Sequence, residues 1–148
     1  MLLFLLQTAL IVLCTSLAFW RGRSAEKFGS LILLTSAVVD KLYHLLIDMP
    51  VHDQVDVFHL TLDITAFVAA YALALKADRL WPMPFASALL LSVFAHLARS
   101  IDSDMAELVY AIMARAPFWL SIAILLVGIS TNARLYTLHA FRRWRESQ

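Results

Sequence analysis

The chain has 148 residues, of which 61% are hydrophobic and 16% are charged, and its formal net charge is +1. A soluble domain usually has roughly 45–50% apolar and about 25% charged residues, so this composition excludes a single water-soluble core. Its one cysteine excludes an intramolecular disulfide framework and a cysteine-based zinc site, and nothing in the composition indicates a nucleic-acid partner.

Continuously apolar stretches follow one another along the chain and predict an all-α, polytopic membrane bundle. About 20 helical residues are needed to cross roughly 30 Å of hydrocarbon, and only helices or closed barrels satisfy the backbone in lipid. The stretches do not alternate between apolar and polar residues, which argues against barrel strands. We therefore expect one domain, residues 1–148, with five transmembrane helices at approximately 1–20, 29–47, 58–76, 83–99 and 108–129.

The connections between these stretches contain residues that interrupt helices. Residues 21–30 include two glycines, Pro50 follows the second stretch, and Pro82 and Pro84 lie at the beginning of the fourth. The first stretch lacks the basic start and the small-residue cleavage site of a secretory signal peptide, so we expect it to be retained as a helix.

Charge is segregated between the two sides of the predicted bundle. One set of connections, with the tail, is basic through Arg21, Arg23, Lys27, Lys76, Arg79, Arg134, Arg142, Arg143 and Arg145. The other set is acidic through Asp48, Asp53, Asp56, Asp102, Asp104 and Glu107, against Arg99 alone. Basic connections of membrane proteins stay in the cytoplasm. We therefore predict a bacterial-type inner-membrane protein with its N-terminus outside and its C-terminus in the cytoplasm.

Residues 132–148 predict a short amphipathic tail helix. Leu135, Leu138, Phe141 and Trp144 recur every three residues among four arginines. Such a helix lies on, or emerges from, an anionic inner leaflet.

Several ionisable residues fall inside the predicted spans, where each Asp, Lys or Arg costs about 2.5–3.5 kcal/mol at a helix centre. Asp40 and His44 are four residues apart, as are His59 and Asp63, so each pair shares a helix face. At about 1.5 Å per residue, all of them lie in the half of the bundle near the acidic connections. The sequence therefore predicts an outward-facing polar pocket built by Asp40, His44, His59, Asp63, His96 and Arg115.

This pocket supports more than one chemistry. Imidazole and carboxylate groups suit zinc, iron or manganese, which predicts a divalent-metal site among Asp40, His44, His59, Asp63 and His96. Alternatively, His96 could ligate a single b-type haem together with His44 or His59, and the apolar half of the bundle would suit a quinone tail. A plainer alternative is a structural ion pair of Asp40 or Asp63 with Arg115.

For function, these features favour binding over catalysis. The pocket is expected to hold a metal ion, a cofactor or a polar lipid headgroup that enters from the periplasm. The chain could equally serve as an accessory subunit of a larger membrane complex, or form a homo-oligomer in the lipid bilayer. The alternatives are a membrane-embedded metal-dependent hydrolase, with a carboxylate as general base, and a subunit that binds b-haem or quinone.

Overall fold

The computed structural model describes residues 2–46, 57–101 and 106–146. These residues form helices joined by short connections, and none of them is in a strand. The helices are α1 (Leu2–Arg21), α2 (Ser24–Leu46), α3 (Val57–Lys76), α4 (Pro82–Ile101) and α5 (Glu107–Glu146). The all-helical prediction is confirmed, and most helix bounds agree with the apolar stretches to within two residues.

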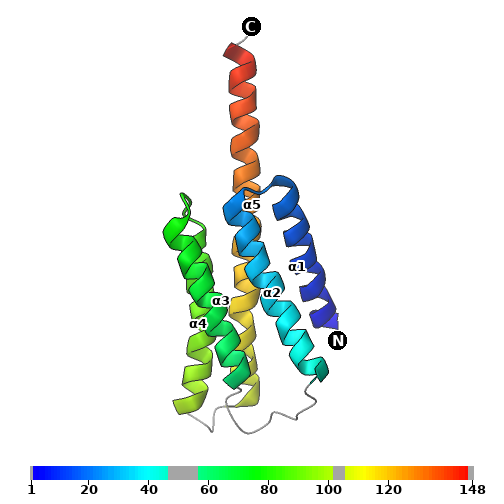
Figure 1. Cartoon of the computed structure of the whole chain (residues 1–148), viewed down its shortest axis with the longest axis vertical. Coiled ribbons are helices and arrows are strands. Elements are labelled where there is room, and N and C mark those ends of the chain that lie inside the picture. Colours follow the sequence, from blue (N-terminus) through cyan, green and yellow to red (C-terminus); the bar gives the residue numbers. More distant parts are fainter. Residues whose placement is uncertain (1, 47–56, 102–105, 147–148) are drawn as a thin grey trace.

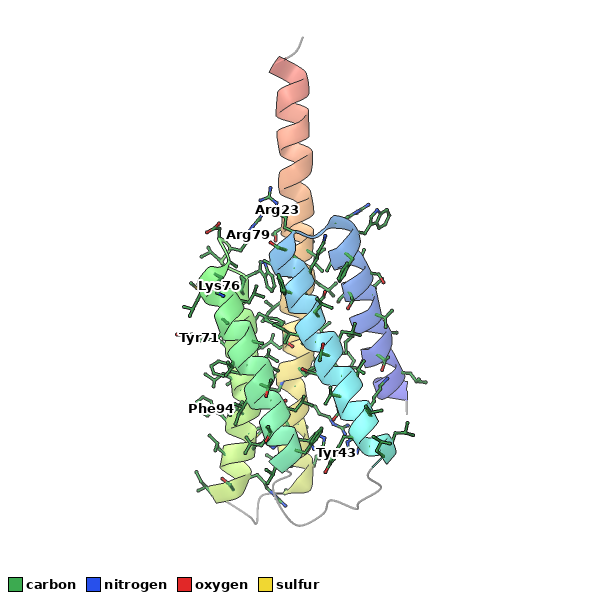
Figure 2. The ribbon with its side chains drawn as sticks, in the orientation of Figure 1. Arg23, Tyr43, Tyr71, Lys76, Arg79 and Phe94 are labelled. Carbon is green, nitrogen blue, oxygen red and sulfur yellow. The ribbon has the colours of Figure 1, made fainter. Side chains whose placement is uncertain are left out.

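Four segments are long and apolar enough to cross a membrane, and they lie in α2, α3, α4 and the Leu108–Thr131 part of α5. The apolar segment of α1, Leu5–Arg21, is shorter. Large apolar side chains cover the outside of the bundle: Tyr71 and Phe94, for example, are each about half exposed and lie on the flanks of α3 and α4 (Figure 2). An exposed apolar surface of this extent is typical of a protein that packs against lipid.

Consecutive helices run in opposite directions and close into a ring, because α5 packs against α4 and also against α1 and α2 (Figure 1). We call the end where α1 and α3 finish, and where α2 and α4 begin, the basic end. The opposite end, where α2 and α4 finish and α3 and α5 begin, is called the acidic end. The last part of α5 leaves the bundle at the basic end (Figure 1).

Helix α2 begins at Ser24, so it includes residues that the sequence assigns to a connection. The reason is an N-terminal cap: the backbone N–H of Arg23 donates to Glu26 Oε2 at 2.8 Å. A glutamate three residues into a helix that bonds back in this way satisfies a donor that would otherwise have no partner. The turn between α1 and α2 is therefore only Gly22 and Arg23.

Trp81, just before α4, closes the basic end of the core. Its indole N–H donates to Glu26 Oε1 at 3.1 Å. Its ring lies so close to Gly29 of α2 and Gly128 of α5 that a Cβ atom on either glycine would meet it at 2.7 Å and 2.8 Å respectively. The two glycines therefore provide the space that the indole occupies between α2 and α5.

Helix α5 is continuous from Glu107 to Glu146, with Pro117 inside it. The predicted tail is helical over residues 132–146, but it continues α5 rather than forming a short helix of its own, and residues 147–148 lie outside the described residues. Neither proline nor glycine occurs between Ile129 and Glu146 to interrupt the helix. Forty residues of helix extend about 60 Å, roughly twice the thickness of a bilayer core.

Candidate functional site

Two helices bring together a group of three potential metal ligands at the acidic end. Asp40 and His44 lie on the last turns of α2, and His59 lies on the first turn of α3. Asp40 Oδ1 is 2.9 Å from His59 Nε2 and 3.8 Å from His44 Nε2. The ligand atoms of all three residues lie within 4.8 Å of one another. We call these three residues the Asp40 triad.

The Asp40 triad is open to its surroundings. The His44 side chain is 58% exposed, that of Asp40 is 34% exposed and that of His59 is 26% exposed. A stacked pair of rings, Tyr43 and Phe58, borders the group with centroids 3.8 Å apart. The Tyr43 ring also meets the His59 ring edge to face at 5.6 Å, so aromatic packing orients that imidazole. Figure 2 labels Tyr43 at this end of α2.

A hydrogen bond holds Asp40 and His59 together. If the ring of His59 is neutral, its Nε2–H donates to the carboxylate of Asp40. An ion bound through the same atoms requires that proton to leave Nε2, either to Nδ1 or to water, because a metal needs the free lone pair.

A second cluster joins α3, α4 and α5. His96 Nε2 of α4 lies 3.2 Å from Asp63 Oδ2 of α3, and the hydroxyl of Tyr110 on α5 lies 2.7 Å from His96 Nδ1. The guanidinium of Arg99 is 5.6 Å from the centre of the Tyr110 ring. Because the His96 side chain is only 5% exposed and both ring nitrogens have partners, this cluster ties α3, α4 and α5 together.

The structure therefore distributes the predicted pocket over two clusters. Asp40, His44 and His59 are brought together, whereas Asp63 and His96 belong to the second cluster. Each of the two carboxylates pairs with a histidine.

Arg115 belongs to neither cluster. Its side chain is exposed and, among the described residues, makes no hydrogen bond or ion pair. Pro117, Ser121 and Leu125 form the buried face of α5. Arg115 is two positions from Pro117, about 200° around the helix, so it faces away from the bundle. The predicted ion pair with Asp40 or Asp63 is thus absent from the described part of the chain.

Two other ionisable side chains have roles that the sequence does not reveal. Lys41 Nζ donates to Thr8 Oγ1 at 2.8 Å and ties α2 to α1. Glu26 is completely buried, although it lies in a sequence segment expected to be a solvated connection. The signal that could have identified Glu26 is its position three residues after Arg23, which suits a capping glutamate.

Comparison of this chain with protein-family models, with curated proteins and with solved structures finds no match.

The chain is therefore a helical protein with membrane-type helices, and its Asp40 triad could hold a metal ion.

Proposed function

We propose that the chain is a five-span protein of a bacterial-type inner membrane. It binds a divalent metal ion, such as zinc, iron or manganese, at Asp40, His44 and His59. The segregation of charge supports the orientation. With the basic end in the cytoplasm, as the positive-inside rule requires, the N-terminus and the Asp40 triad face the periplasm. The role is binding, either alone or as an accessory subunit of a larger membrane complex.

The observation that carries this proposal is the geometry of the Asp40 triad. Ligand atoms about 2.0–2.1 Å from a tetrahedral zinc ion lie roughly 3.3 Å from one another. The distances from Asp40 Oδ1 to the two imidazoles, 2.9 and 3.8 Å, lie on either side of that value. The exposed His44 ring has room to close the remaining gap. Three protein ligands leave a coordination position open for water or a further ligand.

Local electrostatics favour a cation at this position. Asp40 supplies a negative charge, and the second carboxylate, Asp63, is paired with His96. A fixed cation beside the triad would repel a metal ion, but Arg115 is exposed on α5 and makes no contact with the triad. The Lys41 ammonium group donates to Thr8 on the α1 side.

The same contacts favour metal binding over the alternatives. A hydrolase needs a general base beside the metal in addition to its ligands, and Asp63 already accepts a hydrogen bond from His96. A haem needs a free histidine nitrogen, whereas both nitrogens of His96 have partners. The rings of His44 and His59 lie 5.2 Å apart, centre to centre, beside one carboxylate, which suits one shared ion.

Metal titration of the purified full chain in detergent tests this function. After removal of bound metal, isothermal titration with zinc chloride should give one site per chain, with elemental analysis confirming the stoichiometry. His59→Ala and Asp40→Asn should weaken binding by at least about 100-fold, because loss of a ligand exceeds the 10- to 100-fold effect of an outer-shell partner. Unchanged binding in both variants, or no stoichiometric binding by the unmodified chain, would overturn the proposal.

His139→Gln provides a matched control for the titration. His139 lies in the part of α5 beyond the bundle, so its replacement removes one imidazole and leaves the Asp40 triad intact. Zinc affinity should stay within about twofold of the unmodified chain. A large loss of zinc affinity in this variant would show that the zinc ion binds at a histidine outside the Asp40 triad.

Orientation is tested separately with reporter fusions. A reporter that is active only in the periplasm should be inactive when it is fused after Gln148, and a cytoplasmic reporter should be active there. The opposite pattern would place the Asp40 triad on the cytoplasmic side.

A further inference from the structure

An apolar groove lies between α1 and α5 near the basic end, far from the Asp40 triad. Its volume is about 400 Å³, and its lining is mostly hydrocarbon. The lining residues are Leu17, Arg21, Leu126, Val127, Ile129 and Ser130. From Leu17 to Arg21 the groove follows about 6 Å of α1, which is the length of the glycerol-proximal part of an acyl chain rather than of a whole lipid tail.

The cationic side chain of Arg21 lines the groove at the end of α1. Arg21 is the last residue of α1, and its guanidinium lies 4.8 Å from the centre of the Trp20 ring. The Trp20 side chain is 76% exposed. An exposed tryptophan with an arginine on its face is suited to the headgroup layer, where an amphipathic ring and a cation both find partners.

The charge of Arg21 is available to an external ligand. Among the described residues it makes no ion pair, and the nearby carboxylate of Glu26 is buried and accepts two N–H groups. Figure 2 shows Arg23, Lys76 and Arg79 at the same end of the bundle. The groove is apolar, and the guanidinium of Arg21 at its end makes no ion pair among the described residues. Other basic residues lie at the same end of the bundle. These features are complementary to a hydrocarbon chain that carries a phosphate.

We propose that this groove binds one anionic phospholipid, with the upper part of an acyl chain between Leu17 and Val127 and the phosphate at Arg21. The inference rests on the membrane placement proposed above and is independent of the metal site. Lipid at this position fills the gap between α1 and α5. It holds α1 against the bundle.

Native mass spectrometry of the full chain released from detergent tests the lipid site. Added phosphatidylglycerol should bind with a stoichiometry of one and at least fivefold more tightly than phosphatidylcholine of the same acyl chains. Arg21→Gln should lower the phosphatidylglycerol affinity by about fivefold, the factor that corresponds to about 1 kcal/mol per basic residue at a membrane surface. Val127→Trp should reduce the affinity for both lipids by filling the groove.

Lys76→Gln is the matched control, because Lys76 is exposed at the same end but α3 lines no part of the groove. Its phosphatidylglycerol affinity should change by less than twofold. An effect as large as that of Arg21→Gln would show attraction by net charge alone and would overturn the proposal. Equal affinity for the two lipids, or displacement of the lipid by inorganic phosphate, would also overturn it.

A second measurement, quenching of tryptophan fluorescence by a brominated lipid, tests the position of the bound lipid. Phosphatidylglycerol brominated near the carbonyl end should quench tryptophan fluorescence less in Trp20→Phe than in the unmodified chain, because Trp20 contributes the quenched signal. Equal quenching would contradict the proposed position. Zinc binding by Arg21→Gln should remain unchanged, so failure of the lipid site and failure of the metal site are distinguishable.

Discussion

At the basic end of the bundle, Glu26 is completely buried and its two oxygens accept N–H groups from Arg23 and Trp81. At the acidic end, Asp40 is 34% exposed and lies between two histidines, one of which is itself largely exposed. Both are carboxylates of the same helix, α2, but they lie toward its opposite ends. They differ in burial and in how far hydrogen-bond donors of the protein occupy their oxygen atoms.

That difference separates a structural role from a binding role. A fully buried carboxylate with a donor on each oxygen is out of reach of an external ligand, and removing its partners is costly. A partly exposed carboxylate beside two imidazoles retains lone pairs for a cation. The basic end should therefore respond to mutation through stability, and the Asp40 triad should respond to added metal.

The largest expected effect is that of Glu26→Ala on stability. It removes the helix cap and leaves the partly buried Trp81 indole N–H without its acceptor, which together cost about 3 kcal/mol. Thermal unfolding in detergent, followed by helical circular dichroism, measures this loss. Ser24→Ala is the control, because Ser24 is exposed and is the first residue of α2. This substitution should change stability by less than about 0.5 kcal/mol. Equal stability of the two variants would mean that Glu26 does not hold the basic end together.

Zinc should produce the next largest effect, and only through the acidic end. At a free concentration 100 times the dissociation constant, a ligand that binds only the folded chain stabilises it by about 2.7 kcal/mol. The unmodified chain and Glu26→Gln should both show this stabilisation in thermal scans with and without zinc. Asp40→Asn should show almost none. Equal stabilisation of Asp40→Asn would place the zinc elsewhere and remove the contrast between the two ends.

Gly29→Ala tests the close packing of Trp81 at the basic end. The added methyl group would lie 2.7 Å from the indole, and overpacking of this kind costs about 1–3 kcal/mol. In a Trp81→Phe background the smaller ring should relieve most of that penalty. A double-mutant cycle on unfolding free energies measures the coupling. Additive effects of the two substitutions would show that the glycine does not accommodate the indole.

The smallest effect is expected for Tyr110→Phe at the acidic end. It removes the hydrogen bond to His96, and side-chain hydrogen bonds between membrane helices average about 0.6 kcal/mol. Unfolding should therefore be slightly easier, whereas zinc affinity should not change, because the second cluster is separate from the Asp40 triad. Tyr71→Phe, at an exposed site on α3, is the control and should have no effect. A marked loss of zinc binding in Tyr110→Phe would show that the two clusters act as one site.

The positions of the helices could be predicted from the sequence because they follow from the chemistry of individual segments. An apolar run long enough to cross hydrocarbon forms a helix wherever it packs, and the breakers Pro82 and Pro84 identify the start of α4. The two exceptions have local causes. Helix α2 starts early because Glu26 caps it, and α5 continues through the tail because no residue interrupts it.

The partners of each ionisable side chain could not be predicted in the same way. Spacing along a helix shows that His59 and Asp63 share a face, but not which neighbouring helix each side chain meets. His59 pairs with α2 and Asp63 with α4. For Arg115, the burial of Pro117 and Ser121 turns α5 so that the guanidinium points away from the bundle.

By itself, the sequence determined the approximate bounds of the helices among the described residues and the alternation of basic and acidic connections along the chain. Those properties depend on hydrophobic length and on charges within short segments. Only the tertiary structure decided that Asp40, His44 and His59 meet, that Glu26 is buried under Trp81, and that a groove remains beside Arg21. The rotation of each helix about its own axis is set by packing against its neighbours, and no single segment of sequence contains that information.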